Sequence, residues 1–310
     1  MSETYRVGIA GARGHTGSEL IRLIAANEQL RLELAGSREL AGEPVPGAAG
    51  VVFESPDPAT TAERYLDALF LALPDGAGDG YVEAVESTSP DTVIVDISFD
   101  HRLDDSWVYG LPELNRDKVR GTRRVANPGC YATAMQLALA PLIDRTSGVP
   151  AVFGVSGYSG AGTTPGPTND VERLRDNLMP YKLVGHNHER EASRHLGHEI
   201  RFMPHVHPAF RGLIVTAHVP LQEPSTTEEI ATLFQERYEA EPLVSLQDAP
   251  PELRDGAGLT GVVIGGIETS ADGRNVVVVA AEDNLLKGAA VQALQNVNLA
   301  LGLPEFSGIL

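Results

Sequence analysis

The sequence predicts an α/β protein that combines a doubly wound parallel-sheet domain with a second α+β domain built on a mixed sheet. Three observations lead to this prediction. A glycine-rich turn, GIAGARGHTG, joins an early strand pattern to a helical pattern. Strand and helix patterns then alternate through the first half of the chain. Beyond about residue 150, longer β-rich runs are separated by polar helical segments.

The strand patterns of the first half are short apolar runs that end at glycine, proline or a polar residue. They are YRVGIAG, a segment around residues 32–35, LDALFLALP ending at Pro74, and DTVIVDIS. A helix is predicted over SELIRLIAANEQL, because Leu20, Leu23 and Ile24 recur at helical spacing. GDGYVEAVEST is a further helical pattern. This alternation is typical of βα units around a parallel sheet.

The second half has more extended β patterns, namely PAVFGVSGYSGAG, EIRFMPHVHP, GLIVTAHVPL and NVVVVAAEDN. A helix is predicted over STTEEIATLFQERYEAE, with Ser225 as its N-cap and Glu228 completing a capping box. The segment NLLKGAAVQALQNVNLALGL predicts one long helix ended by Gly302 and Pro304. These patterns predict a mixed sheet in a second domain.

Composition limits the classes of function. A chain of 310 residues, 42% of them hydrophobic, predicts about two domains. The net charge of −18 argues against nucleic acid as a partner, because phosphate binding needs clustered Lys and Arg. No signal-peptide pattern and no run of 18 apolar residues occurs, so the protein is expected to be cytoplasmic and not to bind membranes.

The glycine-rich turn is a candidate dinucleotide site of the Rossmann type. Its glycines lie directly between a predicted strand and a predicted helix, where backbone N–H groups can approach a pyrophosphate at the helix N-terminus. A simple surface turn is the competing interpretation. The candidate cofactor residues of this turn are Gly8, Gly11, Arg13, Gly14, His15, Thr16 and Gly17. Leu73 and Pro74, at the end of the third strand pattern, join the candidate set.

The end of the second strand pattern bears on the choice between NAD and NADP. An acidic residue at this place binds a ribose 2′-OH, whereas a cation accommodates a 2′-phosphate. The chain has Ser37 and Arg38 here, which favours NADP. A solvated arginine on a loop is the competing interpretation, and the neighbouring Glu39 would suit a 2′-OH.

Cys130 is the only cysteine, so no intrachain disulfide forms and the thiol is either a small core residue or a reagent. It follows Asn-Pro-Gly and precedes a helical pattern. The unpaired N–H groups and positive dipole end of a helix stabilise a thiolate, and the same amides can hold an oxyanion. Cys130 is therefore a candidate covalent nucleophile.

A nucleophile of this type needs a group that handles protons. Seven of the nine histidines lie between His186 and His218, and the pairs HNH and HVH supply His186 with His188 and His205 with His207. One catalytic histidine among them is expected. No metal is expected, because neither a second cysteine nor a carboxylate at ligand spacing completes a zinc site.

Together these motifs resemble the N-acetyl-gamma-glutamyl-phosphate reductase family, which is related in architecture to aspartate-semialdehyde dehydrogenase. The matching segments span nearly the whole chain in the family's order. They are GIAGARGHTGSELIRL, LFLALPDG, VIVDIS, HRL, VYGLPELNR, VANPGCYATA, GYSGAGTTP, YKLVGHNHEREAS, FMPHVHPAFRG and AEDNLLKGAAVQALQNVNLALGLPE. YGLPELNR followed by NPGCY, with DNLLKGAA near the end, is highly specific.

The resemblance implies a fold, an activity and an assembly. The NADP-binding domain would comprise residues 1–129 and 283–310, closed by the C-terminal helix, and residues 130–282 would form the domain for catalysis and subunit contacts. Cys130 would attack an acyl phosphate to give a thioester, which NADPH reduces to N-acetylglutamate semialdehyde in arginine biosynthesis. A small-molecule acyl phosphate is the expected substrate, and the protein is expected to be a homo-oligomer, either dimer or tetramer.

The resemblance also implies roles for individual residues. His188 is expected to be the acid/base, with His186 as the second candidate. Arg102 and Arg211 would bind phosphate or carboxylate through their planar forks. Asn284 would lie near the nicotinamide. The remaining expected substrate-binding residues are Asn127, Ser156 and Gly157.

Two departures from the family pattern leave the acyl group of the substrate open. SFDHRL stands where the family commonly has S-A-D-F-R-L, and the segment after Ser156 is similar to the short subgroup that includes the reductase part of fungal fused enzymes. N-succinyl or carrier-bound glutamyl or aminoadipyl phosphates could use the same core.

Two different functions compete with the reductase. One is aspartate-semialdehyde dehydrogenase, which shares the cysteine chemistry and the fold but does not match YGLPELNR and DNLLKGAAVQALQN. The second is a nucleotide-sensing protein on an inactive dehydrogenase scaffold. That function predicts decay of the nucleophile and histidine motifs, which are intact here.

Overall fold

Two seven-stranded sheets organise the chain in this computed structural model, which describes residues 4–310. They belong to two units. Unit 1 consists of Met1–Gly129 and Ala289–Leu310, and unit 2 of Cys130–Gly288. The chain thus returns from unit 2 to unit 1 after residue 288, whereas the family resemblance implies that it returns after residue 282. The predicted fold class, a parallel-sheet domain plus a mixed-sheet domain, is confirmed.

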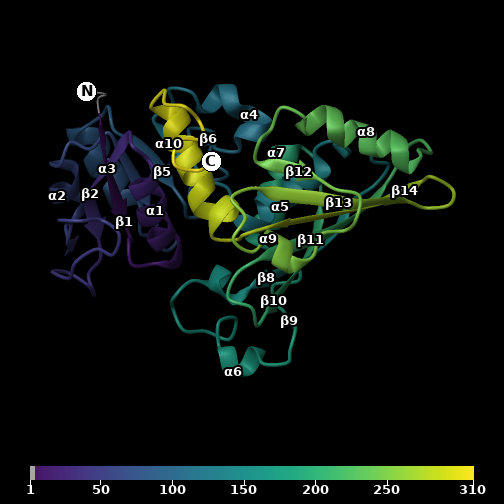
Figure 1. Cartoon of the computed structure of the whole chain (residues 1–310), viewed down its shortest axis with the longest axis horizontal. Helices are drawn as coiled ribbons and strands as arrows, with labels where there is room; N and C mark the ends of the chain where they lie inside the picture. Colours follow the sequence, from purple (N-terminus) through teal and green to yellow (C-terminus); the bar gives the residue numbers. More distant parts are fainter. Residues whose placement is uncertain (1–3) are drawn as a thin grey trace. The chain divides into compact units, whose positions relative to one another are not determined.

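Unit 1 carries the parallel sheet, with strand order β3-β2-β1-β4-β5-β7-β6 (Figure 1). Its elements are β1 (Tyr5–Ala10), α1 (His15–Ala26), β2 (Leu30–Gly36), β3 (Phe53–Glu54), α2 (Pro58–Ala62), β4 (Ala68–Leu71), α3 (Asp79–Thr88), β5 (Val93–Asp96), β6 (Val108–Tyr109), α4 (Pro112–Val119), β7 (Arg124–Ala126) and α10 (Val291–Ala300). All of its strand pairs are parallel. The strand order reverses between β1 and β4, which is the topological switch point where open α/β sheets bind ligands.

The C-terminal segment completes unit 1. Helix α10, yellow in Figure 1, contacts α1, α4 and β5 and is buried along its whole length although it carries four amide side chains. One of them, Asn296, donates to the Gly110 carbonyl at 2.9 Å and to the Asn127 side chain at 3.0 Å. Residues 286–300 form the continuous helical segment that the sequence predicts, but its first turn, Leu286–Ala290, is π-helical and runs directly into α10. Such turns widen a helix locally and are frequent at functional sites.

Unit 2 carries the mixed sheet, with strand order β12-β13-β14-β11-β8-β10-β9. Its elements are α5 (Cys130–Leu139), β8 (Ala151–Gly157), α6 (Val171–Leu174), β9 (Met179–Pro180), α7 (Asn187–Leu196), β10 (Arg201–His207), β11 (Leu213–Pro220), α8 (Thr227–Tyr238), β12 (Val244–Leu246), α9 (Leu253–Gly256), β13 (Val262–Thr269) and β14 (Asn275–Glu282). Helix α5 packs on β11 and β14, and α8 on β12 and β13.

The strands of unit 2 bury one face more deeply than the other. In β11, Val215, Ala217 and Val219 are fully buried, whereas the alternate residues Ile214 and Thr216 are only half-buried. Side chains alternate between the two faces of a strand, so the half-buried residues lie together on the more open face.

Helix α8 begins one residue later than predicted. Thr226 is its N-cap, and Glu229 completes the capping box. Ser225 and Glu228 were the predicted pair, and the register differs because S-T-T-E-E offers two overlapping box patterns. Among residues 4–310, no helix is both long enough and apolar enough to cross a membrane.

Candidate active site

Cys130 is the first residue of α5, as its place in the sequence suggests. It forms no disulfide, and the residue is half-buried. The next residue, Tyr131, is 1% exposed, and its hydroxyl donates to the His205 carbonyl at 2.7 Å. A thiolate at this position meets the positive end of the α5 dipole, which lowers the free energy of the charged form.

Two tyrosines share the surroundings of the thiol. Burial raises the pKa of Tyr131 well above its ordinary value, and the charges of Tyr181 and Cys130 add to the effect. Burial likewise raises the pKa of Tyr181, with Cys130 as the further cause. Both phenols therefore stay protonated at neutral pH. Sequence reasoning singled out neither residue, although Tyr131 directly follows the cysteine and Tyr181 opens the histidine motif.

The histidine pair lies at the start of α7, which packs against α5. His186 is the N-cap, and its Nδ1 accepts a hydrogen bond from the backbone N–H of His188 at 3.1 Å. The two rings are 4.9 Å apart, and the ring of His188 lies 6.0 Å from that of Tyr131. The structure thus brings both histidines to the residues around Cys130.

The two histidines differ in their electrostatic setting. Burial lowers the pKa of His186 to about 4, and the positive charge of Lys182 contributes. An Nδ1 that accepts an amide proton is itself unprotonated, which agrees with this direction. His186 is therefore neutral throughout the physiological range and serves as the cap that sets the start of α7.

The second histidine pair is placed elsewhere. The ring of His205 packs on Phe153 at 4.4 Å, on the more open face of the sheet, and its Nδ1 lies 3.1 Å from the Met203 carbonyl. His207 is exposed, and its Nδ1 accepts from the backbone N–H of Ala209. Neither ring joins the residues around Cys130.

The π-helical turn contacts Cys130 through Gly288. A Cβ on Gly288 would lie 2.6 Å from the Cys130 Cβ and 2.9 Å from Glu282 Oε1, so only glycine fits between these two side chains. Glu282 and Lys287 are both fully buried. Lys287 and Gly288 are the K-G pair of the motif DNLLKGAA. The reason for a glycine at this position is apparent only from its contact with Cys130 in the structure.

Ser156 and Gly157 are the last two residues of β8, directly before the loop that follows this strand. Ser156 is 4% exposed, and its hydroxyl donates to the Gly157 carbonyl at 3.1 Å. Asn284 binds the beginning of this loop, since its Nδ2 donates to Ser159 Oγ at 2.9 Å, and its Oδ1 accepts from the Gly212 N–H at 3.0 Å. The amide of Asn284 is thus occupied at both ends and holds two loops of unit 2 together.

Arg211 lies in the second of these loops. Its Nη1 is 3.4 Å from Asp283 Oδ2, and its side chain is 29% exposed. Asp283 is fully buried and also accepts backbone N–H groups from Gly258 and Leu285. A guanidinium that a buried carboxylate holds in one orientation is suited to binding an anion.

The glycine-rich turn of unit 1 follows β1 at the switch point. Gly11 has φ +88°, and a Cβ there would lie 2.1 Å from the Ala72 carbonyl oxygen, so the turn requires glycine. Gly14 is the N-cap of α1, no side chain caps this helix, and its first turn has no acidic residue. The turn therefore leaves backbone donors available for a pyrophosphate. Leu73 and Pro74 follow β4, the other strand at the switch point.

Of the three residues that follow β2, Ser37 and Glu39 are bonded to neighbouring groups, whereas Arg38 is exposed. Glu39 forms an ion pair with Arg13 at 3.0 Å, so the nearest carboxylate is engaged by a cation. Ser37 Oγ accepts from the Leu40 N–H at 3.2 Å. Arg38 is exposed, and its charge acts on the phenol of Tyr81.

Arg102 and Asn127 are both buried in unit 1 and are bonded to backbone. Arg102 Nε donates to the Asn127 carbonyl at 2.8 Å, and its Nη2 donates to the Ile97 carbonyl at 2.7 Å. Asn127 Nδ2 donates to the Ala289 carbonyl at 3.2 Å. In the unusual SFDHRL segment, His101 Nδ1 lies 2.7 Å from the buried carboxylate of Asp96. These side chains order the loop after β5.

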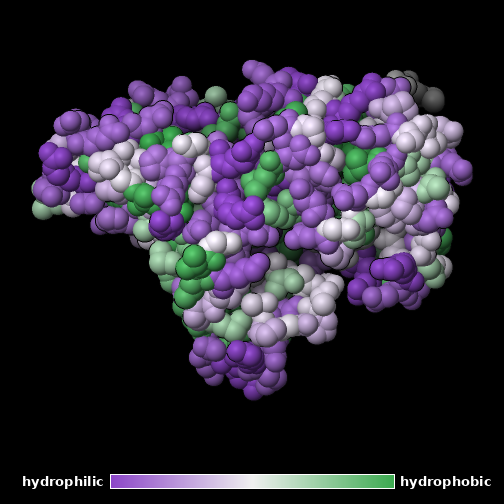
Figure 2. Space-filling view, turned by 180° about the vertical axis from the view of Figure 1, so that it is seen from behind, coloured by the Kyte–Doolittle hydropathy of each residue, from purple (hydrophilic) through white to green (hydrophobic). Residues whose placement is uncertain are grey.

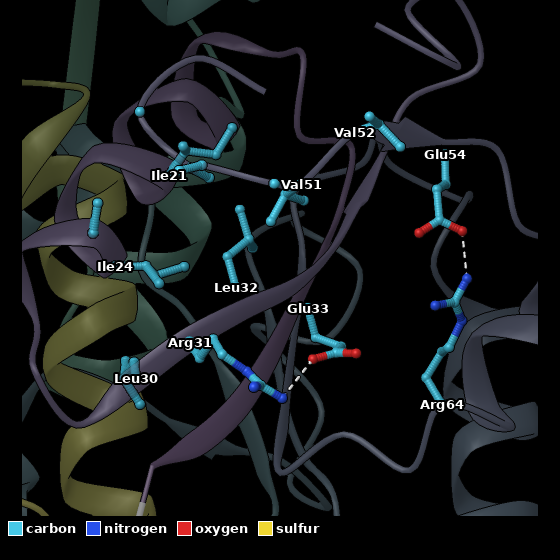
Figure 3. A pocket seen from close by; sticks show the side chains of 15 residues that line it. Ile21, Ile24, Leu30, Arg31, Leu32, Glu33, Val51, Val52, Glu54 and Arg64 are labelled. Atoms are coloured by element: carbon cyan, nitrogen blue, oxygen red, sulfur yellow. Dashed lines mark hydrogen bonds and ion pairs between the residues drawn. The ribbon is translucent and has the colours of Figure 1, made fainter. Parts of the chain in front are cut away.

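A separate cavity of about 630 Å³ lies in unit 1 between α1, β2 and the loop 47–52 (Figure 3). Its floor is apolar, and two ion pairs, Arg31 with Glu33 and Arg64 with Glu54, lie at its rim. None of the predicted cofactor residues lines it. Within residues 4–310, no group of three or more His, Cys, Asp or Glu side chains is arranged to hold a metal ion.

Comparisons with known structures agree with the fold. Aspartate semialdehyde dehydrogenase II from Vibrio cholerae, complexed with ASA, superimposes with a TM-score of 0.78 at 18% identity and covers 97% of this chain and 99% of its own. Aspartate semialdehyde dehydrogenase with NADP from Candida albicans gives 0.75 at 15% identity, with coverage of 97% and 99%. At these identities the similarity concerns the fold alone.

Sequence comparisons are more specific. Residues 6–122 match the NAD binding domain of semialdehyde dehydrogenase, and residues 130–284 match its dimerisation domain. N-acetyl-gamma-glutamyl-phosphate reductase from Stenotrophomonas maltophilia is 51% identical over 99% of this chain and 98% of its own length. The protein of that name from Xanthomonas campestris pv. campestris (strain B100) is 52% identical over 98% of each chain. The chain therefore belongs to the N-acetyl-gamma-glutamyl-phosphate reductase family.

Proposed function

We propose that this protein reduces N-acetyl-gamma-glutamyl phosphate to N-acetylglutamate semialdehyde and phosphate, with NADPH as reductant, in the cytoplasmic biosynthesis of arginine. The observation that carries the proposal is the position of Cys130 at the start of α5, beside a histidine pair of which one member is a fixed neutral cap. About half of the residues are identical to reductases of that name over the full chain.

The cofactor residues other than Asn284, which would lie near the nicotinamide, are assigned to unit 1. The turn Gly8–Gly17 fits a pyrophosphate, because its helix has no side-chain cap and no acid in its first turn. Leu73 and Pro74 line the other side of the switch point. The bound cofactor supplies a hydride to the acyl carbonyl. Arg38 and Arg13 favour NADPH, since the one nearby carboxylate after β2, Glu39, is already paired with Arg13.

The chain's own residues carry the acyl transfer. The thiolate of Cys130 attacks the acyl carbonyl, the bond between that carbon and the phosphate oxygen breaks, and phosphate leaves with the electron pair. A thioester remains on Cys130. The N–H groups at the start of α5 stabilise the oxyanion of each tetrahedral stage. Arg211 binds an anionic group of the substrate, because its guanidinium is half-buried and oriented by Asp283.

His188 is assigned the proton transfers, with His186 as the cap that orients it. His188 takes the thiol proton as Cys130 becomes a nucleophile, and after hydride transfer it donates this proton to the hemithioacetal alkoxide. It takes the hydroxyl proton back as the carbon–sulfur bond breaks, which releases the aldehyde and the Cys130 thiolate. Ser156, Gly157 and Asn284 shape the loop that faces the reacting group. We propose that Arg102 and Asn127 contribute to substrate binding by ordering the loop after β5.

A reductase assay with different acyl groups tests this function. The reverse reaction, phosphate-dependent reduction of NADP, is measured with N-acetylglutamate semialdehyde, its N-succinyl analogue, the aminoadipate analogue and aspartate semialdehyde. We expect the highest kcat/KM for the N-acetyl compound. A preference for the aminoadipate or N-succinyl compound would instead support a reductase of a related acyl phosphate, the alternative that the resemblance to the short, fungal-fusion-like subgroup leaves open. A preference for aspartate semialdehyde would contradict the proposal.

Replacing Arg38 with Asp tests the choice of cofactor. The substitution removes a cation that would face the 2′-phosphate of NADP and adds an acceptor for the 2′-OH of NAD. We expect the ratio of kcat/KM for NADPH to that for NADH to fall by roughly 100-fold, corresponding to about 3 kcal/mol. Arg31→Asp, on β2 but at the separate cavity, is the matched control. Equal ratios in both variants would remove Arg38 from the cofactor site.

We also propose that the protein is a homo-oligomer that pairs through the open face of the sheet in unit 2. The family match over residues 130–284 is a dimerisation domain. The open face carries Phe153, which is 39% exposed, and the half-buried residues Met203, Ile214 and Thr216 beside it. Figure 2 shows a hydrophobic patch above the hydrophilic tip at the bottom of the view. Sedimentation of the full chain at the mass of a monomer would contradict this assignment.

A further inference from the structure

Asn296 is a fully buried amide on α10 that is bonded to two other segments of unit 1. Its Nδ2 donates to the Gly110 carbonyl at 2.9 Å and to Asn127 Oδ1 at 3.0 Å. The Gly110 N–H in turn donates at 2.9 Å to the carbonyl of Ala126, the last residue of β7. Asn296 thus joins the segment after β6 to the segment after β7.

The contact between Asn296 and Gly110 leaves no room for a side chain at position 110. A Cβ there would lie 2.6 Å from Asn296 Cγ and 2.6 Å from Val125 Cγ1, much closer than non-bonded carbon atoms pack. Gly110 belongs to YGLPELNR and Asn296 to VQALQNVNLALGL, two segments far apart in the sequence. The glycine therefore allows the amide of α10 to reach the backbone after β6.

Backbone carbonyls fix the direction of both amide groups, because a carbonyl oxygen only accepts hydrogen bonds. The Gly110 carbonyl requires the NH2 group of Asn296. The Ala289 carbonyl requires the NH2 group of Asn127, which lies 3.2 Å away, so Asn127 presents its oxygen to Asn296. The Oδ1 of Asn296 is buried and has no hydrogen-bond partner within residues 4–310, so its two donated bonds alone hold this amide in the core.

Asn127 connects this bond to the turn before the nucleophile. It is fully buried, and its backbone N–H donates to the Asp96 carbonyl at 2.7 Å. Its Nδ2 also donates to the Pro128 carbonyl at 3.4 Å, within the turn that leads to Cys130. Two residues separate Asn127 from Cys130, the first residue of α5. The orientation of the Asn127 side chain therefore bears directly on where α5 begins.

We propose that Asn296 is a positioning residue that holds the side chain of Asn127 and thereby fixes the turn before Cys130. Buried hydrogen-bonded networks rigidify the segments that they join. The helix start stabilises a thiolate only if its N–H groups and dipole are directed at the sulfur, so a displaced turn stabilises the thiolate less. The inference rests on the proposed function only in taking Cys130 as the nucleophile.

The pH dependence of alkylation tests this role without substrate or cofactor. Cys130 is the only cysteine, so the rate of reaction with iodoacetamide reports this thiol alone in the full chain. We expect Asn296→Ala to raise the midpoint of the rate profile by roughly half a pH unit, because the charged form of the thiol loses stabilisation. In turnover the same variant should lower kcat by about 10-fold or more, since small displacements of reacting groups are costly.

Asn298→Ala is the matched control. Asn298 is equally buried on the same helix, and its Nδ2 also donates two bonds, to the Glu305 and Ser307 carbonyls, both at 3.0 Å. These bonds hold the C-terminal segment and not the turn before Cys130. We expect both variants to lower Tm, but only Asn296→Ala to shift the midpoint. An unchanged midpoint in Asn296→Ala, or equal shifts in the two variants, would overturn the proposal.

A double-variant cycle shows whether Asn296 acts through Asn127. If it does, Asn296→Ala should add no further shift in a chain that already carries Asn127→Ala, whereas additive shifts would contradict the proposal. If Asn296→Ala does not fold, Asn296→Ser replaces it, with a smaller shift in the same direction expected and an unchanged midpoint counting against the proposal. Because alkylation requires no turnover, a shifted midpoint without reductase activity would refute the proposed function and leave the role of Asn296 in place.

Discussion

Cys130→Ser is expected to lower kcat by roughly 10,000-fold or more, because a serine hydroxyl at neutral pH is protonated and far less nucleophilic than a thiolate. The substitution is nearly isosteric and keeps the start of α5, so the fold should survive. The Kd for NADPH should stay within about twofold, since all the assigned cofactor residues except Asn284 belong to unit 1. Initial rates of NADPH oxidation and fluorescence titration of the cofactor measure the two quantities.

Mass spectrometry of the intact protein separates this mechanism from direct hydride transfer. Incubation with the acyl phosphate in the absence of NADPH should add one acyl group to the natural chain and none to Cys130→Ser. A natural chain that turns over without ever gaining this mass, or a serine variant with a near-normal rate, would show that the covalent mechanism is wrong.

His188→Asn is expected to have the second-largest effect, a loss in kcat of roughly 100-fold to 10,000-fold, the usual range for general acid–base catalysis. Cofactor affinity should barely change. His186→Asn is the matched variant, because asparagine is also a good N-cap and can accept the same backbone N–H. We expect this variant to raise KM more than it lowers kcat. Steady-state kinetics of both variants decide between the assignments.

The pH profile provides an independent check on the histidines. Burial makes protonation of His186 unfavourable and lowers its pKa to about 4, so a rate that depended on this ring would change near that pH. We expect no titration there. A large kcat loss in His186→Asn, or an inflection near pH 4 that this variant removes, would reverse the assignment. Mild effects in both variants would direct attention to His205 and His207.

The sequence by itself determined the features that depend only on residues close together in the chain. A strand, a glycine turn and a helix without a side-chain cap follow one another within residues 5–26, and the proposed anion site depends on the backbone of that turn alone. Cys130 was recognisable because the start of a helix lies directly at its own position. The presence of two different sheets was predicted from the change in strand pattern near residue 150, because the periodicity of apolar residues can be read from neighbouring residues alone.

Tertiary structure decided the features that depend on distant partners. The distinction between His186 and His188 arises from the residue at which α7 begins and from burial by other elements, neither of which the H-x-H spacing contains. Gly288 adjoins Cys130 only because the π-helical turn returns to the start of α5. Burial and hydrogen-bond partners are properties of the packed chain, so no single motif encodes them.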